Sequence, residues 1–500
     1  MRGQLRTIDM DVHHRLKKDT LMSHLSRRQF LVTSAAAGAV SALARPSFAL
    51  ANDEINLGFI SCGGRAGEHM KQFSSISGVN IGALCDPDEG RLASANKRFP
   101  DAKAYVDLRD LIADKSIDAV VVATSNHWHC LASIWAMEAG KHVYVEKPLS
   151  HNQWEGRQTV EAARKYGRVC AIGTQQRSDP MQAEIKKFLH EEKGLGELVS
   201  ARVNRYGVRG AIGKRSTPLP IPSNVNYDLW LGPAQDQPIF RDKLQYDWHW
   251  DWNTGSGEMG NWGVHVLDDV RNNVFQDEVT LPVRIFGGGA RVVYNDAGNT
   301  PNVHFVYFDT GKIPVVIGLS NLPAGTDQKG SPAHPGPGSG YIAYCEGGRL
   351  EGQRGSAKAF DKDGKVVKEF KGNGGNGLHH RNFLDAVRAG DQSMLNANVA
   401  VGHDSTGWCN LANIAVRAGT PFKYEAASAI DEQVWSELVG EMKKHMAAHS
   451  IELDGGDFQL SPILHVDPAK EVFVGEHAAS ANEFLRREYR APYEVPEITA

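Results

Sequence analysis

The residues with the clearest chemical potential are Glu146, Lys147 and Pro148, which follow the apolar run 142–145. Strand ends are where α/β proteins bind their ligands. A buried strand that ends at this point would deliver the ammonium of Lys147 into an active site. Most of the other chemically suggestive residues can be placed relative to this lysine.

A second candidate cluster lies in residues 261–268, Asn-Trp-Gly-Val-His-Val-Leu-Asp. If this segment is helical, Asn261, His265 and Asp268 share one face, because they are spaced i, i+4 and i+7. A histidine between two polar groups can be held in one tautomer and tuned in pKa, as a general base requires. The alternative is a core histidine whose hydrogen bond is satisfied by Asp268.

A glycine-rich turn precedes both clusters. The apolar segment 55–60 runs into Ser61-Cys62-Gly63-Gly64-Arg65-Ala66-Gly67, and a helix-like segment follows. The three G-x-G-x-x-G positions hold Ser61, Gly63 and Ala66. Such a turn presents backbone N–H groups and a helix N-terminus to a pyrophosphate. An ordinary glycine turn is the alternative.

Asp86 ends the next apolar segment, 79–85, about 20 residues after the glycines. A carboxylate in this position accepts hydrogen bonds from both ribose hydroxyls of an adenosine. It also repels a 2′-phosphate, so NAD is favoured over NADP. The competing interpretation is a polar turn, Asp86-Pro87-Asp88.

Apolar segments alternate with helix-like segments from residue 52 to about 175. The segments 117–123, 142–145 and 169–173 each run into a polar cluster. This alternation predicts a doubly wound parallel sheet with its ligand at the carboxyl ends of the strands. The fold class is therefore α/β, with a Rossmann domain at residues 52–175.

Several of these stretches resemble the Gfo/Idh/MocA oxidoreductases: the glycine turn, residues 123–129 (Ala-Thr-Ser-Asn-His-Trp-His), Glu146-Lys147-Pro148 and residues 173–177 (Gly-Thr-Gln-Gln-Arg). The sequence departs from the family at Ser61, usually glycine, and Ser125, usually proline. The resemblance implies that Lys147 touches cofactor ribose and substrate, and that Pro148 follows a cis peptide. The cofactor is then expected at Ser61, Gly63, Gly64, Arg65, Ala66, Asp86, Thr124, Asn126, His129, Glu146, Lys147 and Gln176.

Residues 176–425 predict a second, α+β domain. The segments 198–206, 303–308 and 313–319 are apolar or alternate like strands. They indicate a large, mainly antiparallel sheet with one open face. Open faces of this kind mediate oligomerisation or close over substrate, so a homo-oligomer is expected. Residues 426–500 form a tail with a helix at 431–449 and long loops.

The family pattern Asp-x-Gly-x-His-x-x-Asp is similar to residues 261–268, with Asn261 in the first aspartate position. Because an amide cannot take up a proton, His265 and Lys147 would share the acid/base work. His379 resembles the histidine of a His-x-x-Asn-Phe segment, where the rival role is capping or an interface.

Tryptophans 248, 250, 252 and 262 suggest stacking on pyranose rings, with a tryptophan-rich core loop as the alternative. The predicted substrate-binding residues are Arg177, Trp252 and His379.

Residues 26–31, Ser-Arg-Arg-Gln-Phe-Leu, form a twin-arginine sequence. A mild apolar stretch, 32–44, and the small-x-small site Ala49-Leu50-Ala51 follow. The stretch is too short for a membrane span, so it predicts an export signal rather than an integral membrane protein. The twin-arginine translocase carries folded proteins, which suits a protein exported with its cofactor to the periplasm and cleaved after about Ala51. Met22 is an alternative start.

Composition narrows the function classes further. The chain has 500 residues, 41% hydrophobic content and a formal net charge of −4, with no long basic run. This argues against nucleic acid or anionic lipid as the main partner. None of the six cysteines lies in a C-x-x-C pair, so small buried thiols are expected.

The sequence thus predicts an NAD(P)-dependent oxidoreductase that acts on a sugar, polyol or glycoside with a tightly bound cofactor. The first alternative is a glycoside hydrolase or lyase that oxidises the sugar ring transiently. A metal site built from His127, His129, His265, Asp268 or His379 matches no standard zinc spacing, and no metal is assigned. A non-enzymatic sugar-binding module is the last alternative.

Overall fold

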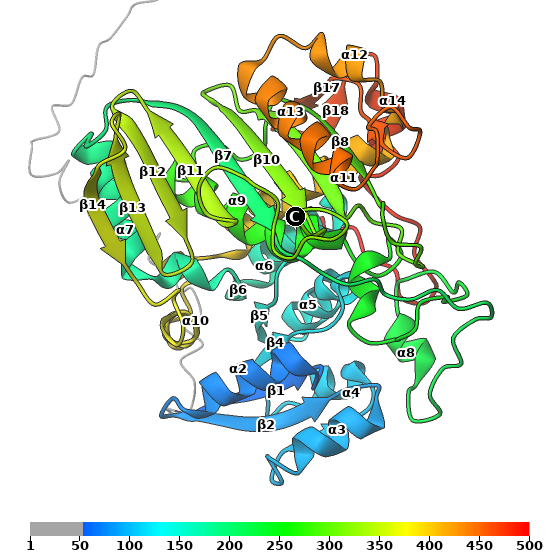
Figure 1. The fold of residues 1–500 in the computed structure, drawn as a ribbon. Coiled ribbons are helices and arrows are strands. Elements are labelled where there is room, and N and C mark those ends of the chain that lie inside the picture. The colour runs from blue at the N-terminus through cyan, green and yellow to red at the C-terminus, as the bar shows by residue number, and fades with distance from the viewer. Residues whose placement is uncertain (1–53, 500) are drawn as a thin grey trace, which may run out of the picture. The chain divides into compact units, whose positions relative to one another are not determined.

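The first structural unit is a six-stranded parallel sheet. The computed structural model describes residues 54–499, so the predicted export signal lies outside the described residues. The strand order is β3-β2-β1-β4-β5-β6 (Figure 1). The strands are β1 Ile55–Ile60, β2 Val79–Cys85, β3 Lys103–Tyr105, β4 Ala119–Val122, β5 His142–Val145 and β6 Cys170–Ile172. This is the doubly wound Rossmann sheet predicted from the sequence.

Helices cover both faces of this sheet, which explains why its strands are apolar runs rather than alternating patterns. They are α2 Gly64–Ser74, α3 Glu89–Asn96, α4 Leu108–Ala113, α5 His129–Glu138 and α6 Gln153–Tyr166. Helices α2 and α3 pack on one face, and α4, α5 and α6 pack on the other. The chain reverses direction across the sheet between β1 and β4, so their carboxyl ends border a crevice.

Distant parts of the chain complete the core of this first unit. Phe383 and Val387 of α10 (Leu378–Ala389) pack on the face that carries α2. Tyr493 and Val495 of the tail pack on the opposite face. The tail therefore covers the Rossmann core, and the contacts of this core extend beyond the predicted range 52–175.

The second unit is a 12-stranded sheet in the order β14-β13-β12-β11-β7-β10-β9-β8-β16-β15, with β17 and β18 attached beside β8. Neighbouring strands are antiparallel except for β7 and β10. The bounds are β7 Leu198–Tyr206, β8 Arg284–Ala290, β9 Val303–Asp309, β10 Pro314–Ser320, β11 Ser339–Cys345, β12 Gly348–Gln353, β13 Ser356–Asp361, β14 Val366–Lys371, β15 Thr420–Pro421, β16 Gln459–Leu460, β17 Leu464–Asp467 and β18 Val472–Val474. The large, mainly antiparallel sheet was predicted correctly.

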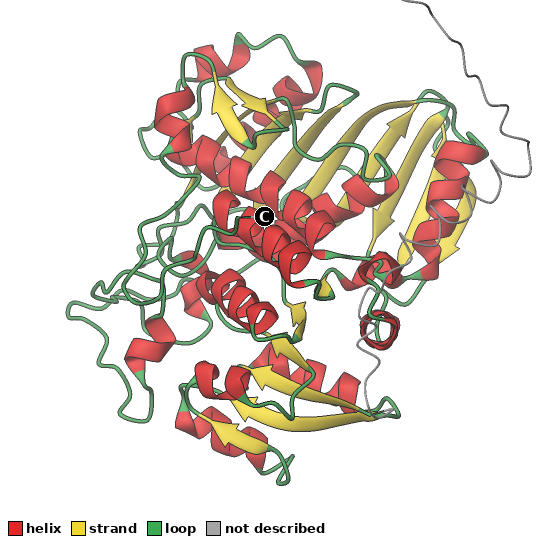
Figure 2. Ribbon diagram, turned by 180° about the vertical axis from the view of Figure 1, so that it is seen from behind, coloured by secondary structure: helices red, strands yellow, loops and turns green. Residues whose placement is uncertain are grey.

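Side chains of the central strands alternate between two cores. In β9, Val306 and Phe308 face the core that holds α9, whereas Phe305 and Tyr307 face the core that holds Trp435 of α13. The outer part of the sheet, β12 to β14, carries no helix on the side seen in Figure 1, while helices line the side seen in Figure 2. The helices of this unit and the tail are α7 Pro180–Lys186, α8 Tyr227–Leu231, α9 Val264–Asn273, α11 Val399–Arg417, α12 Tyr424–Ser428, α13 Gln433–Ala447 and α14 Ala478–Asn482.

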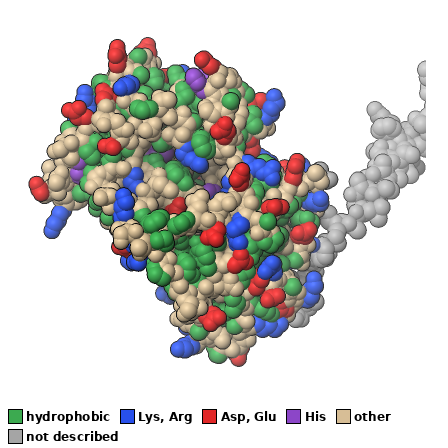
Figure 3. All heavy atoms as spheres, turned by 90° about the vertical axis from the view of Figure 1, so that its right-hand side faces the viewer, with side chains coloured by type: hydrophobic (Ala, Val, Ile, Leu, Met, Phe, Trp, Pro, Cys, Tyr) green, Lys and Arg blue, Asp and Glu red, His purple; other side chains and the backbone are tan. Residues whose placement is uncertain are grey.

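The remaining observations concern the cysteines and the surface. All six cysteines are buried free thiols, as expected. Within residues 54–499, no helix is both long and apolar enough to span a membrane. On the face that includes the side of α8, acidic and basic side chains are interspersed, and basic and histidine side chains border a hollow (Figure 3).

Gly156 fixes the close approach of α6 to α11. A Cβ at Gly156 would lie 2.4 Å from Nδ1 of the buried His403 and 2.9 Å from Oγ of Ser150. We expect Gly156→Ala to destabilise the protein by about 1–3 kcal/mol, because a packed interior must move. Gly440→Ala in α13 is the matched control, since its Cβ meets no atom within 4 Å and should stabilise by about 0.4–1 kcal/mol. Thermal melts of both variants test this, and equal melting temperatures would contradict it.

Candidate active site

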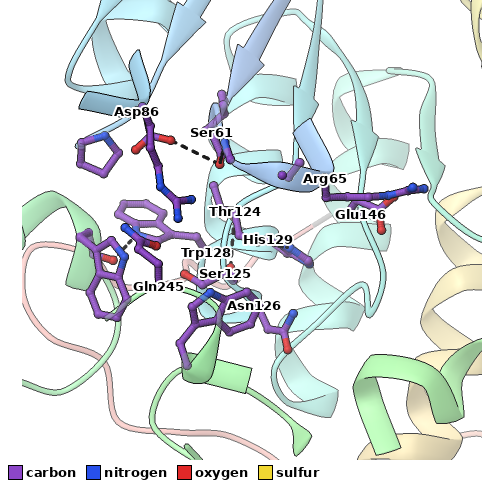
Figure 4. A pocket seen from close by; sticks show the side chains of 18 of the residues that line it. Ser61, Arg65, Asp86, Thr124, Ser125, Asn126, Trp128, His129, Glu146 and Gln245 are labelled. Atoms are coloured by element: carbon purple, nitrogen blue, oxygen red, sulfur yellow. Dashed lines mark hydrogen bonds and ion pairs between the residues drawn. The ribbon is translucent and has the colours of Figure 1, made fainter. Parts of the chain in front are cut away.

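A cavity of about 520 Å³ opens at the carboxyl ends of β1, β2, β4 and β5 (Figure 4). Its first half is lined by the glycine turn, Asp86 and the segment after β4. Lys147 stands at the boundary, and residues 229–261 of the second unit form the other half. The predicted cofactor residues that line it are Ser61, Gly63, Gly64, Arg65, Asp86, Thr124, Asn126, His129, Glu146 and Lys147. The structure thus brings these ten together.

The glycine turn has the backbone that a pyrophosphate site needs. Ser61 has a φ of 92°, a left-handed conformation that normally favours glycine, so the serine keeps the family's backbone shape. A Cβ at Gly64 would meet no atom within 4 Å, and no side chain caps the N-terminus of α2. The backbone N–H groups at this helix start are therefore free to bind a phosphate. Ala66 does not line the cavity but is buried in the core, so its predicted cofactor contact is replaced by helix packing.

Asp86 is held in place by backbone donors. Its carboxylate accepts hydrogen bonds from the N–H of Cys62 at 2.7 Å and of Asp88 at 2.9 Å. Burial raises its pKa, while these backbone donors and the charge of Arg91 oppose the shift. The carboxylate lines the cavity beside the glycine turn, so its position fits the ribose of an adenine nucleotide.

Glu146 is a buried charge of the site with several hydrogen-bond partners. Its Oε1 accepts from Nε of Arg65 at 2.7 Å, from Nε2 of His69 at 2.7 Å and from Nε2 of Gln175 at 3.1 Å. Burial alone would raise its pKa, but the Arg65 charge and the His69 hydrogen bond hold the pKa well below its ordinary value. His69 was missed in the sequence; its only signal was its place on the buried face of a predicted helix.

Lys147 contacts the second unit directly. Its Nζ donates to the backbone oxygen of Asn261 at 2.8 Å and to Oδ1 of Asn261 at 3.2 Å. The Asn261 amide group donates in turn to Glu258 at 3.1 Å. Burial lowers the pKa of Lys147, and the nearby Glu146 charge opposes the shift. The peptide bond between Lys147 and Pro148 is cis, as the resemblance implied.

Glu258 was not predicted from the sequence, although it orients Asn261. Its carboxylate is fully buried and accepts from Nε of Arg205 and Nε of Arg209, both at 2.8 Å. An amide whose NH₂ group is bound to a carboxylate turns its oxygen to the other side, toward the ammonium of Lys147. The only sequence signal was an acid among glycines just before the His265 motif.

The His265 motif differs from its predicted arrangement. Residues Met259–Gly263 form a π-helical turn before α9. Asp268 accepts from Arg177 at 2.8 Å and from Ser405 at 2.6 Å; within residues 54–499 no hydrogen bond joins His265 to Asn261 or Asp268. The prediction that these two flank the histidine as hydrogen-bond partners is therefore wrong, because a charged arginine takes Asp268. His265 is half-buried, and its ring packs against Trp262 with centroids 5.5 Å apart.

Burial and the charge of Lys147 lower the pKa of His265 well below 6.5. The imidazole is therefore neutral at neutral pH and able to accept a proton. The structure thus leaves His265 a candidate base without the tautomer-fixing partner expected from the sequence.

The predicted site residues that do not line the cavity are seven: Ala66, Gln176, Arg177, Trp252, His265, Asp268 and His379. Arg177 is buried between Asp268 and Asp277, with Nη1 and Nη2 bonded to Asp277 at 2.7 and 2.8 Å. Gln176 donates to Asp269 at 2.9 Å. These two residues join the loop after β6 to α9 and its following turn, so the structure places Arg177 and Gln176 outside the cavity in which their substrate and cofactor contacts were predicted.

His379 also turns away from the cavity. One ring nitrogen bonds to the carbonyl of Ile172 at 2.8 Å, and the other bonds to Oγ of Ser178 at 2.7 Å. Both ring nitrogens of this buried histidine are used, which favours the rival structural role.

The aromatic lining of the cavity comes from Trp128, Trp230, Tyr246 and Trp248. Trp248 stacks on His249, with ring centroids 3.7 Å apart. Trp252, the predicted substrate platform, lies in a second cavity instead, because the chain turns between the two tryptophans. Trp230 was missed, since nothing in the local sequence pattern at 227–231 links it to the site.

The residues considered for a metal do not form a cluster in the described part of the chain. The ring nitrogens of His127 bond to the carbonyls of Thr254 and Trp230. Among residues 54–499, the group with suitable spacing is His403, Asp404 and Glu471. Arg157 pairs with Glu471 and Arg271 pairs with Asp404, so both carboxylates are already neutralised.

Comparison with known proteins supports the fold. Residues 55–174 match the model of an oxidoreductase family with an NAD-binding Rossmann fold. Residues 209–323 match the C-terminal alpha/beta domain of an oxidoreductase family, and residues 24–44 match a twin-arginine translocation signal. The first domain is therefore an NAD-binding Rossmann domain, and the chain carries an export signal.

Among curated proteins, an inositol 2-dehydrogenase of Salmonella typhimurium is 31% identical over 184 residues, which are 35% of this chain and 54% of that protein. A glycosyl hydrolase family 109 protein of Shewanella sp. is 34% identical over 129 residues, 24% of this chain and 28% of that protein. The matches thus span about half or less of these relatives. The solved structure of a levoglucosan dehydrogenase with NADH and levoglucosan shares the fold, with a TM-score of 0.54 and 17% identity over 72% of this chain and 97% of that one.

Replacement of Asp86 tests the nucleotide half of the cavity. We expect Asp86→Asn to weaken NADH binding by about tenfold or more, because hydrogen bonds to a charged acceptor contribute about 1.5–3 kcal/mol. The preference for NADH over NADPH should also narrow, since the repulsion of a 2′-phosphate is lost. Fluorescence titration of nucleotide-stripped protein measures both. Asp88→Asn is the control, because Asp88 caps α3 and does not line this cavity; equal losses in the two variants would contradict the assignment.

The depressed pKa of His265 predicts the pH dependence of turnover. A base must be deprotonated, and a folded-state pKa well below 6.5 keeps this one neutral as the pH falls to 6.5. The kcat for alcohol oxidation should therefore show no acid limb above pH 6.5, and His265→Gln should lower kcat by about 10²-fold or more. A pH profile of kcat tests this. An acid limb above pH 6.5 that disappears in His265→Gln would contradict the shift.

Proposed function

We propose that this chain, whose residues 55–174 and 209–323 match models of the Gfo/Idh/MocA oxidoreductase family, is an exported, NAD-dependent oxidoreductase that acts on a hydroxyl of a sugar, polyol or glycoside. The observation that carries this proposal is the position of Lys147. Its ammonium stands between the nucleotide half of the cavity and Asn261 of the second unit, one helical turn before His265. The inositol 2-dehydrogenases among the relatives support a polyhydroxylated substrate.

In this proposal the nucleotide half binds and orients the cofactor. The free N–H groups at the start of α2 hold the pyrophosphate, and Asp86 accepts from the ribose hydroxyls. When bound, NAD supplies the acceptor for the hydride of the substrate carbon. The buried hydrogen bonds of Glu146 keep the backbone at Lys147 rigid. A rigid backbone is needed to align two reactants.

The proton acceptor in this proposal is His265, which follows Asn261 of the substrate half by one helical turn. Lys147 holds the reacting hydroxyl by a charged hydrogen bond, while Asn261 and Glu258 keep its ammonium in place. His265 accepts the hydroxyl proton, because its imidazole is neutral. Asp268 contributes indirectly, because its ion pair with Arg177 anchors α9 and so positions His265.

The export signal extends the proposal to the route of the protein. The twin-arginine translocase carries the folded chain with NAD already bound to the periplasm, and cleavage follows about Ala51. Because free NAD is scarce there, the cofactor stays bound and is recycled by a second substrate. The face of β12 to β14 that carries no helix is proposed as a homo-oligomer contact.

A second candidate reaction is cleavage of a glycoside by transient oxidation. The similarity to glycosyl hydrolase family 109 proteins favours it as the alternative. Oxidation of a ring hydroxyl to a ketone acidifies the neighbouring C–H. Loss of the proton from this carbon allows elimination of the glycosidic substituent. Water then adds to the ring, and the ketone is reduced back to the hydroxyl. The same cavity and base would serve, but no net oxidation would result.

One experiment separates these candidates. The mature protein should release NAD when denatured, and a glycoside and polyol panel should change the absorbance of the bound nicotinamide. Accumulation of oxidised product supports the dehydrogenase, whereas cleavage without net oxidation supports the alternative.

Lys147→Met should lower kcat by about 10²-fold or more. The exposed Lys115 is the matched control, so Lys115→Met should leave kcat unchanged. Absence of released nucleotide, or full turnover by Lys147→Met, would overturn the proposal.

A further inference from the structure

A second cavity of about 470 Å³ has no part in the proposed reaction. It lies between the carboxyl end of α11, the loop 251–253 and the tail residues 483–488, and it shares no lining residue with the first cavity. Trp252 belongs to its wall. Its volume is in the range of sites that hold small organic ligands.

Arg417 is the central charge of this second cavity. Its guanidinium lies over the ring of Trp252 at 5.2 Å and over the ring of Phe484 at 4.1 Å. Within residues 54–499, no hydrogen bond or ion pair engages its N–H groups. Burial and the charge of Arg487 lower its pKa to about 10, so it remains charged at neutral pH. Two aromatic rings thus hold the guanidinium in position while its donors stay available.

Arg487 adds a second positive charge beside the first. Its terminal nitrogens donate to the backbone oxygen and to Oδ1 of Asn253, both at 2.9 Å, which fixes its orientation. Among the described residues, no carboxylate forms an ion pair with Arg417 or Arg487. Asp251, Glu483 and Glu488 also line the cavity, and Arg241 takes the carboxylate of Asp251 at 2.7 Å. The charge of the buried Glu155 acts on Arg487 without forming an ion pair with it. Two adjacent guanidiniums without an ion-pair partner among the described residues favour a bound anion, because arginine matches a carboxylate with two parallel hydrogen bonds.

Carboxamides make up most of the remaining polar wall. Asn413 is 6% exposed, and its amide group donates to the backbone oxygen of Ser256 at 2.9 Å, which leaves its buried Oδ1 without a partner. Asn410 is 4% exposed and also lines the cavity. The carboxamide side chains that line the cavity are Asn152, Gln235, Gln237, Asn253, Asn299, Asn410 and Asn413. Carboxamides form hydrogen bonds with sugar hydroxyls, whereas an inorganic anion has no hydrogen-bond donor for the carboxamide oxygens.

We propose that this cavity is a second binding site, distinct from the reaction site, for a carboxylate-bearing sugar. The carboxylate binds to Arg417 and Arg487, and the ring hydroxyls bind to the carboxamides of the wall. The site would let the exported protein hold an acidic sugar residue while the first cavity acts on another hydroxyl.

D-Glucuronate is the probe, and ligand-observed NMR titration of the mature protein is the measurement. Saturable binding is expected, with D-glucose and inorganic sulfate each weaker by about tenfold or more, since each lacks one half of the recognition. Arg417→Gln should weaken glucuronate binding by about tenfold or more. Arg417→Lys, which keeps the charge and loses the paired donors, should weaken it by a smaller factor. Lys147→Met should leave it unchanged, which separates this site from the proposed reaction.

Several outcomes would overturn the assignment. If sulfate binds as tightly as glucuronate, the cavity is a simple anion site. If glucose binds as tightly as glucuronate, the arginines do not recognise a carboxylate. Loss of glucuronate binding in Lys147→Met but not in Arg417→Gln would place the ligand in the first cavity. Dissociation of an oligomer by Arg417→Gln, without glucuronate binding by the parent protein, would assign the arginines to an acidic side chain of a second copy.

Discussion

The buried carboxylate of Glu146 is the interaction on which the site depends. An ionised carboxylate costs several kcal/mol to remove from water, and only close charged and hydrogen-bonding partners offset this cost. The partners here come from α2 through Arg65 and His69, and from the segment after β6 through Gln175. The charge of Glu146 therefore holds two parts of the site together. One is the start of α2, which is proposed to bind a pyrophosphate, and the other is the end of β5, which carries Lys147. Lys147 follows Glu146 directly, so it inherits this rigidity.

A second set of buried charges joins the Rossmann domain to the sheet domain. Arg177 follows β6, and its two carboxylate partners Asp268 and Asp277 lie on α9 and just beyond it. Removal of either side would leave an uncompensated buried charge, which typically destabilises by about 3–5 kcal/mol. This contact sets the position of α9, whose first turn carries His265. Arg177, which was predicted to bind the substrate, thus connects the two domains and positions His265.

The contrast between correct and incorrect predictions follows from the range of the interactions. The sheet, the glycine turn, Asp86 and Lys147 depend on apolar runs and their adjacent turns, which the local sequence contains. The partners of Asp268, His379 and Trp252 depend on segments far along the chain, such as the ion pair that spans 91 residues between Arg177 and Asp268. A titratable side chain bonds to the strongest partner that the fold brings near, and spacing within one helix does not reveal that partner. Glu258 and His69 were missed for the same reason, because their importance lies in contacts with Asn261 and Glu146.

The asparagine at position 261 changes how the charge of the site is balanced. An aspartate there would form an ion pair with Lys147 and raise the pKa of its ammonium. Asn261 offers only a neutral oxygen, while the charge of Glu258 behind it is shared with Arg205 and Arg209. Burial consequently prevails, and the pKa of Lys147 falls. The same positive charge, unneutralised at position 261, helps to keep His265 neutral. An amide in place of an acid at position 261 therefore couples Lys147 to His265. Lys147 lacks a counter-charge at this position, and its positive charge keeps His265 in the neutral form that accepts a proton.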